Sequence, residues 1–143
     1  MDLLEFEDFP SQTFDKVRYA DTDRQGHVNN AVFATFLETG RVQFLYNKDL
    51  PVLPEGASFV IAALQMIFRK ELHWPGQVDI GSGIIKIGNS SVKLLQQLHQ
   101  NGQCAAQAET VIVQVDDATG SSTPLTDEAR EILRRWLLPN RDK

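Results

Sequence analysis

Cysteine is nearly absent from the 143-residue sequence, in which Cys104 stands alone. An intramolecular disulfide is therefore impossible, as are a zinc cluster built on several cysteines and a CxxC redox pair. The sequence also lacks any apolar run near the roughly 18 residues that a membrane span requires. Its opening residues, MDLLEFEDFP, carry acids where a secretory signal carries bases. We expect a cytoplasmic protein that neither enters a membrane nor is exported.

Basic residues are also in short supply. There are 14 Lys and Arg residues against 19 Asp and Glu, a formal net charge of -5, and the bases are scattered. Such a balance gives no general attraction for a phosphate backbone or an anionic lipid surface, so neither nucleic acid nor a membrane is an expected partner. An anionic small molecule would need local bases or a helix N-terminus to hold it.

Internal repeats and low-complexity segments are missing as well, and the Pro and Gly residues fall between candidate elements. The 42% of apolar and 23% of charged residues are ordinary for a packed globular protein. A chain of this length suits one domain, so a single domain over residues 1–143 is expected.

Hydrophobic periodicity predicts the elements. Loose alternation indicates a first strand, and apolar spacings of three and four indicate a long helix after two asparagines suited to capping. Four strand-like runs follow, and Asn101-Gly102 is the strongest hairpin signal between them. A second helix has Thr126 as its N-cap and acids in its first turn. The predicted elements are strand Thr13–Tyr19, helix Ala31–Tyr46, strands Phe59–Leu72, Val78–Gly88, Ser91–Gln100 and Gln103–Val115, and helix Thr126–Leu138.

This order predicts an α+β fold with two layers, in which the long helix lies across an antiparallel sheet. Its own helix covers one face of such a sheet. Met66, Phe68, Val92 and Leu94 are candidates for apolar surface elsewhere, part of which would meet a second subunit.

The segment from Arg18 to Arg41, RYADTDRQGHVNNAVFATFLETGR, resembles the signature of the hotdog-fold thioesterases of the 4-hydroxybenzoyl-CoA type. In that family a strand ends in an Asp-x-Asp loop, a Gly follows, and the central helix carries an acid and an Arg. The ELHWPGQVDIG turn, the GNSS hairpin and the PLTDEAREIL tail also fall where the family has its corresponding pieces. The resemblance implies a hotdog fold, with an antiparallel sheet of about five strands around a long central helix, and a homodimer paired edge to edge or a tetramer.

The resemblance also implies a site. In that family the second Asp is the catalytic carboxylate, which matches Asp23. The backbone N–H that polarises the thioester carbonyl at the start of the central helix matches Asn30. The segment DTDRQGHVNN is similar to the plant acyl-carrier-protein thioesterases as well, whose second Asp, Asn and His match Asp23, Gln25 and His27. Gln25 departs from that pattern, and the two resemblances agree only on Asp23.

The chemistry of thioester hydrolysis supports the same residues. It needs an oxygen nucleophile, or a base that makes one from water, and donors where negative charge builds up on the carbonyl oxygen. A loop that brings the Asp23 carboxylate to a helix N-terminus supplies both, because the first N–H groups of a helix lack internal partners. Gly26 lets the backbone pass close to a substrate. Asp21 is interpreted as a structural turn residue.

Two of the remaining polar sites have both a functional and a structural interpretation. His27 either takes part in the chemistry or only holds the loop. Ser90 and Ser91 form a hairpin that would contact the nucleotide end of coenzyme A, unless it is a plain turn.

The other polar residues are interpreted as structural. Glu38 is expected to pair with Arg41, since it lies about 12 Å along the helix from the helix mouth. His73 and His99 are interpreted as turn and strand-edge residues without metal-ligand neighbours, and Cys104 as a packing residue.

The sequence therefore predicts an enzyme that hydrolyses acyl-CoA to a free acid and coenzyme A, without a metal or a redox cofactor. Asp23 acts as nucleophile or general base, the Asn30 N–H as oxyanion donor, and Gln25 and His27 as supporting polar groups. Two alternatives stay open. One is an acyl-carrier-protein thioesterase, and the other is a hotdog module that binds acyl-CoA without hydrolysing it, since a fold alone does not determine function.

Overall fold

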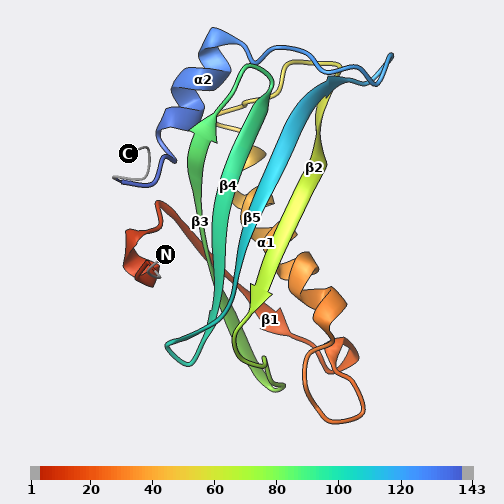
Figure 1. Cartoon of the computed structure of the whole chain (residues 1–143), viewed down its shortest axis with the longest axis vertical. Coiled ribbons are helices and arrows are strands. Elements are labelled where there is room, and N and C mark those ends of the chain that lie inside the picture. Colours follow the sequence, from red (N-terminus) through yellow and green to blue (C-terminus); the bar gives the residue numbers. More distant parts are fainter. Residues whose placement is uncertain (1–3, 140–143) are drawn as a thin grey trace.

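The computed structural model describes residues 4–139, in which an antiparallel sheet curves around one long helix (Figure 1). The sheet has five strands in the order β1-β3-β4-β5-β2, so β1 and β2 are its edges. This arrangement confirms the predicted α+β hotdog fold. The elements are β1 (Ser11–Val17), α1 (Asn30–Leu45), β2 (Ala57–Phe68), β3 (Gly76–Ile87), β4 (Ser91–Gln100), β5 (Gln103–Asp116) and α2 (Asp127–Arg134), with 3-10 helices η1 (Phe6–Asp8) and η2 (Tyr19–Asp21).

Helix α1 begins at Asn30, one residue before the predicted start, because Asn29 caps it. The Asn29 Oδ1 accepts a hydrogen bond from the Ala31 N–H at 3.0 Å, which satisfies one of the free amides of the first turn. One broad face of α1 then packs against the sheet (Figure 1). The buried residues of α1 are Phe33, Phe36, Leu37, Gly40, Arg41, Phe44 and Leu45.

The core lies between α1 and the concave side of the sheet. Phe33 and Leu37 pack with Ile80 and Leu98 in one cluster, while Phe44 belongs to a second cluster. That second cluster includes residues of β4 and α2, so α2 closes the end of the core that the second half of α1 leaves open. The two clusters together hold α1 in place and set the position of its N-terminus.

The apolar surface outside this core lies on the edge strand β2. Val92 and Leu94 are fully buried on β4 under α1 and α2, so the prediction that they supply apolar surface is wrong. Met66 is partly buried against the core, whereas Phe68 is 48% exposed. The exposed large apolar residues of β2 are Val60, Ile61, Leu64, Ile67 and Phe68.

The second helix is shorter than predicted, because the chain leaves α2 at Arg134 to bond to the sheet. The strand β1 pairs with β3 only as far as Ser82, which leaves the outer edge of β3 open beyond that residue. The Ile84 N–H donates to the Trp136 carbonyl at 2.8 Å, and the Leu138 N–H donates to the Ile84 carbonyl at 2.9 Å. Residues 136–138 therefore pair with β3 beyond the point where β1 stops pairing with it.

Several other predicted boundaries also differ from the structure, and two of these differences have a clear cause. Strand β1 ends at Val17 rather than Tyr19, because Tyr19 starts η2. Strand β2 ends at Phe68 rather than Leu72, because the N–H groups of Arg69 and Lys70 both turn to the Ala105 carbonyl, at 2.8 and 3.0 Å.

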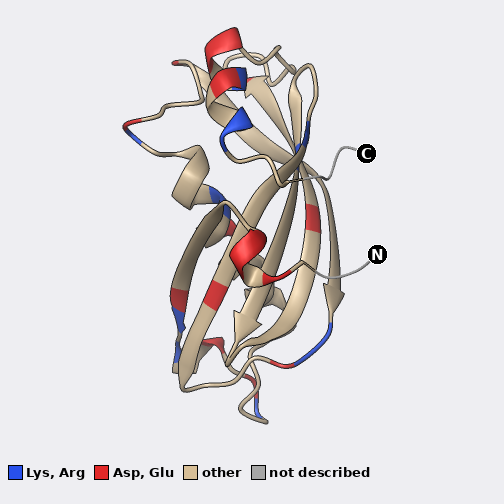
Figure 2. Cartoon of the chain, turned by 90° about the vertical axis from the view of Figure 1, so that its left-hand side faces the viewer, with Lys and Arg blue, Asp and Glu red and all other residues tan. Residues whose placement is uncertain are grey.

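Acidic and basic segments are interspersed over the part of the chain drawn in colour in Figure 2. None of the helices within residues 4–139 has the length and apolarity needed to span a lipid bilayer.

Candidate active site

The loop between β1 and α1 is held by the buried carboxylate of Asp21, which is 2% exposed. Its Oδ2 accepts from the Arg18 backbone N–H at 2.8 Å, and its Oδ1 accepts from the Arg18 Nε and Nη2 at 3.2 and 2.8 Å. Burial acts to raise the pKa of Asp21, but the hydrogen bonds and charge of Arg18 outweigh it and hold the pKa below its ordinary value. The Asp21 carbonyl accepts from the Asn29 N–H at 2.8 Å, so this residue ties η2 to the start of α1.

Asp23 lies two residues further on and is exposed. Its Oδ1 accepts from the backbone N–H groups of Gln25 and His27, at 2.8 and 3.2 Å. Its own N–H donates to the His27 carbonyl at 2.8 Å, and Gly26 closes the turn with a φ of 81°. Within residues 4–139 the second oxygen, Oδ2, has no hydrogen-bond partner. One oxygen therefore fixes the loop while the other is free to react.

A cavity of about 350 Å³ joins this loop to the mouth of α1 and the end of β2. All four residues predicted to be catalytic contribute to it. The cavity is lined by Asp23, Gln25, His27, Val28, Asn30, Phe33, Phe68, Arg69, Lys70 and Glu71. The structure thus brings the predicted residues together around one space, and their catalytic roles stay a prediction.

Asn30 presents the first N–H of α1 at this cavity. In the part of the chain that the structure describes, that N–H donates no hydrogen bond. The aligned peptide dipoles of a helix add roughly half a positive charge at its N-terminus. An oxyanion placed here would find a free donor and a favourable potential.

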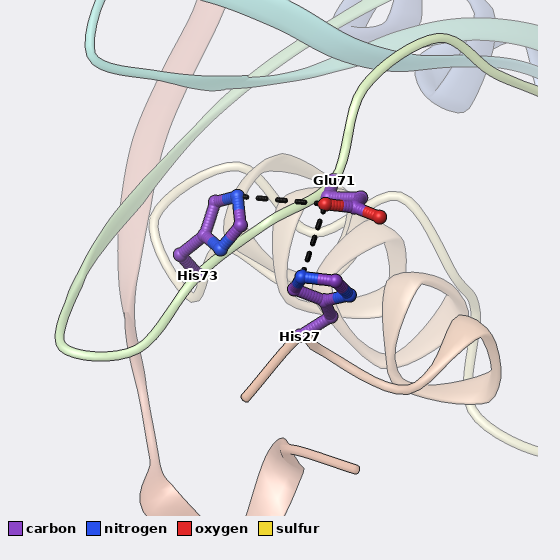
Figure 3. A group of neighbouring side chains, drawn as sticks. All are labelled: His27, Glu71 and His73. Carbon is purple, nitrogen blue, oxygen red and sulfur yellow. Dashed lines mark ion pairs between the residues drawn. The ribbon is translucent and has the colours of Figure 1, made fainter. Parts of the chain in front are cut away.

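Two residues of the cavity wall, His27 and Glu71, form a cluster with the neighbouring His73 (Figure 3). The Glu71 Oε2 lies 3.2 Å from the His27 Nε2 and 3.8 Å from the His73 Nε2. The two rings stand almost perpendicular, at 85°, with their centroids 5.1 Å apart. The prediction that His73 has no metal-ligand neighbours is therefore wrong.

Backbone pairing builds this cluster. His27 and His73 face each other in an isolated antiparallel bridge, and the Val28 N–H donates to the Leu72 carbonyl at 2.8 Å. The largely buried Gln100 side chain forms two hydrogen bonds with the backbone of His73. It accepts from the His73 N–H at 2.9 Å and donates to the His73 carbonyl at 3.0 Å. Both histidines thus project from segments fixed by main-chain hydrogen bonds.

Ser90 and Ser91 lie far from this cavity within one chain. They stand at the hairpin between β3 and β4, at the opposite end of those strands from the cavity (Figure 1). The Ser90 carbonyl accepts from the Gln114 N–H at 2.8 Å, and the Ser91 carbonyl accepts from the Gly88 N–H at 2.7 Å. Their contact with coenzyme A stays a prediction, and it requires a second subunit or an extended ligand.

Arg41 does not pair with Glu38 within the described residues, so that prediction is wrong. Its position on the buried face of α1 leaves it 8% exposed, and its Nη1 reaches the Gln96 Oε1 at 3.4 Å. Burial lowers the pKa of Arg41, and the charge of Glu38 partly opposes this. Both residues line a second cavity of about 390 Å³ between the C-terminal half of α1 and the first half of β2.

Cys104 matches its interpretation as a packing residue. It is half-buried at the start of β5, and its Sγ donates to the Ala106 carbonyl at 3.4 Å. Burial raises the pKa of the thiol, which disfavours the reactive thiolate.

The sequence does not predict a role in the site for Arg69, Lys70 or Glu71, because they fall within the predicted strand Phe59–Leu72. One signal was available, because side chains two positions apart in an extended segment point to the same side, as Glu71 and His73 do. Their meeting with His27 depends on the fold.

Comparison with known proteins now identifies the family. The sequence model of the thioesterase-like superfamily matches residues 17–137. FadM, a long-chain acyl-CoA thioesterase of Escherichia coli strain K12, is 30% identical over 130 residues, which cover 88% of this chain and 98% of FadM.

Solved structures agree. A thioesterase from Thermus thermophilus, complexed with coenzyme A and zinc, is 28% identical with a TM-score of 0.79, over 90% of this chain and 94% of the other. A Pseudomonas aeruginosa protein is 22% identical with a TM-score of 0.83, over 93% of this chain and 95% of the other, and shows the same fold. The chain therefore belongs to the thioesterase-like superfamily and is a thioester-hydrolysing enzyme.

Proposed function

We propose that this enzyme hydrolyses acyl-CoA to a free carboxylic acid and coenzyme A at the cavity beside Asp23. One observation carries the proposal: the free Asp23 Oδ2 and the free N–H of Asn30 belong to residues that line the same cavity. The likeness to FadM, a long-chain acyl-CoA thioesterase, and to a thioesterase solved with coenzyme A supports acyl-CoA as the substrate.

The reaction follows from these groups. The Asp23 carboxylate attacks the thioester carbonyl carbon, or it takes a proton from a water molecule that attacks instead. Negative charge then moves to the carbonyl oxygen, which the Asn30 N–H and the positive end of α1 stabilise. The carbon–sulfur bond breaks, and coenzyme A leaves as a thiol once its sulfur is protonated. After direct attack the acyl group remains on Asp23 as an anhydride, and a water molecule hydrolyses this anhydride to release the free acid and restore the carboxylate. Gln25 and His27 supply further polar contacts at the cavity wall.

Arg69 and Lys70 give the anionic substrate a local attraction that the net charge of -5 does not. Both line the cavity at the point where the chain leaves β2. The Lys70 Nζ is oriented by a 3.0 Å hydrogen bond to the Gln103 Oε1. We infer that these two cations bind the phosphates of the coenzyme A part of the substrate.

The test of the proposal is Asp23→Asn. An asparagine keeps an oxygen that accepts the hydrogen bonds from Gln25 and His27, so the loop retains its shape while the charge is lost. We expect kcat on acyl-CoA to fall at least about a hundredfold with unchanged thermal unfolding, because general acid–base catalysis contributes about 10²–10⁴-fold.

Asp49→Asn, which removes an exposed carboxylate outside the cavity, is the matched control and should retain parental kcat. If Asp23→Asn keeps more than about a tenth of parental kcat, Asp23 does not have this role. Label that enters Asp23 from heavy-oxygen water during a single turnover distinguishes direct attack from activation of water.

The same assays test the substrate class. A series of acyl-CoAs that differ in chain length should be hydrolysed faster than the matching carrier-protein thioesters. The opposite preference would indicate an acyl-carrier-protein thioesterase, and tight binding without release of thiol would indicate a binding module.

A further inference from the structure

We propose that His27, Glu71 and His73 form a binding site for one divalent transition-metal ion of the zinc type. The sequence predicted no metal, because His27 and His73 lie in different segments and only the fold brings them together. The site does not depend on the proposed acyl-CoA activity, since it rests on the three side chains alone.

The spacing of the ligand atoms fits such an ion. Zinc binds histidine nitrogen and carboxylate oxygen at about 2.0–2.2 Å, so tetrahedral ligand atoms lie roughly 3.3–3.6 Å apart. The Glu71 Oε2 is 3.2 Å from the His27 Nε2 and 3.8 Å from the His73 Nε2. One ligand atom from each of the three residues can be chosen so that all three lie within 4.8 Å of one another. The longer distance involves the His73 Nε2, so binding of an ion requires that this nitrogen move closer to the Glu71 Oε2 (Figure 3).

The site is also prepared by the backbone. Both histidine main chains are held in place by the bridge between His27 and His73 and by the hydrogen bonds of Gln100 to His73. Binding of an ion would therefore restrict mainly the side chains, because the backbone is already fixed, and this lowers the entropic cost of binding. This distinguishes the cluster from exposed acids that meet by chance.

The ligand types select the ion. Two imidazoles and one carboxylate suit Zn²⁺, Co²⁺ and Ni²⁺, whereas Mg²⁺ and Ca²⁺ prefer oxygen ligands throughout. Three protein ligands leave a fourth tetrahedral position for water, as in open zinc sites. The three side chains are 30%, 59% and 56% exposed for His27, Glu71 and His73, so an ion can enter from solvent. The neighbouring cations Arg69 and Lys70 oppose the ion and limit its affinity.

Calorimetric titration of the full chain with zinc chloride and with cobalt chloride tests the site. We expect one ion per chain, with binding at least about tenfold weaker in Glu71→Gln and in His73→Gln, since loss of a group supporting a metal already weakens binding about 10–100-fold. Magnesium chloride should give no binding. The near-ultraviolet spectrum of the cobalt complex should lack thiolate charge-transfer bands, and the spectrum should be unchanged in Cys104→Ser, which excludes the one thiol as a ligand.

His99→Gln is the matched control, because His99 lies on β4 with its Nε2 2.8 Å from the Gln97 Oε1 and belongs to no such cluster among the described residues. Zinc affinity should be unchanged in it. Should His73→Gln fail to fold, Glu71→Gln decides, because the Glu71 side chain is exposed. The proposal is overturned if the parent binds no stoichiometric ion, or if Glu71→Gln binds zinc as the parent does. Neither result bears on Asp23, so failure here and failure of the hydrolase assignment are distinguishable.

Discussion

Two carboxylates two residues apart have opposite environments in the loop before α1. Asp21 is buried and both of its oxygens are engaged by Arg18, whereas Asp23 is exposed and keeps Oδ2 free. A reactive carboxylate has to be held in place by something other than its own attacking oxygen. Asp21 supplies part of that support, since its carbonyl binds the N–H of the α1 cap, Asn29.

Asp21→Asn should destabilise the fold in a pH-dependent way. The pKa of Asp21 is held below its ordinary value of 3.8, so the ionised form stabilises the folded chain above that pH. This contribution is lost as the pH falls through the lower pKa of the folded state. We expect the variant to lose about 1.5–3 kcal/mol of unfolding free energy near neutral pH, because hydrogen bonds to a charged group are removed.

Urea unfolding at about pH 7 and about pH 3 checks this, because the difference between parent and variant should shrink at the lower pH. Asp49→Asn, which changes an exposed carboxylate, should show neither effect. A difference that stays constant, or grows, as the pH falls would contradict the assigned environment of Asp21.

At the scale of elements, Gly40 sets the distance between α1 and the sheet. A Cβ at this position would lie 2.5 Å from the Ile80 Cγ2 and 2.8 Å from the Gln96 Nε2. The Gln96 amide has little freedom to move, since it donates to the Leu37 carbonyl and to the Ser82 Oγ, both at 2.9 Å. Close approach of this helix and sheet therefore requires glycine here.

Gly40→Ala should lower the unfolding free energy by about 1–3 kcal/mol, the usual effect of overpacking a core. Alanine is normally the better helix former by about 1 kcal/mol, so the sign of the change is diagnostic. Thr35→Ala, at an exposed position of the same helix, should change stability by less than about 0.5 kcal/mol. Denaturant unfolding of the three proteins measures both, and a Gly40→Ala chain as stable as the parent would show that α1 packs less closely.

The helix α1 and the hairpins were predictable because their signals are local. Apolar spacing and Asn29 determine where α1 starts, and Asn101-Gly102 marks the turn between β4 and β5. The end of α2 was not predictable. Leu137 continues the helical pattern of the sequence, but in the structure its backbone forms a bridge with Ile84 on β3. The end of β2 was not predictable either, because it depends on hydrogen bonds from Arg69 and Lys70 to the Ala105 carbonyl on β5.

The candidate site divides in the same way. Asp23 and Asn30 are close in sequence, at a junction whose pattern resembles a known family, and the structure places both at one cavity. Glu71 lines that cavity and His73 lies beside Glu71, and the backbone bridge between His73 and His27 brings the two segments together. No period or motif in a single sequence encodes such a pairing.

For the whole molecule, the uncovered edge of the sheet is the surface that most needs a partner. Strand β2 pairs only with β5 and carries a row of exposed apolar side chains. A long apolar edge invites pairing with another strand. A two-fold axis across β2 would set two copies antiparallel, so the β3–β4 hairpin of one chain would lie at the level of the other chain's Asp23 cavity. The prediction that Ser90 and Ser91 contact coenzyme A fits such a pair.

We therefore expect the chain to form a dimer through β2. Lysine opposes edge pairing because its like charges on two neighbouring copies would lie close together across the two-fold axis, so Leu64→Lys combined with Ile67→Lys should convert the dimer to a monomer of 16.1 kDa. Phe14→Lys changes an exposed aromatic on the opposite edge strand, β1, and should leave the dimer intact. Light scattering after size-exclusion chromatography reports the masses. A monomeric parent would rule out the dimer, and dissociation caused by Phe14→Lys alone would assign the contact to β1. Because the cavity opens beside the end of β2, at Phe68, the β2 variant should also lose thioesterase activity if the second chain completes the substrate site.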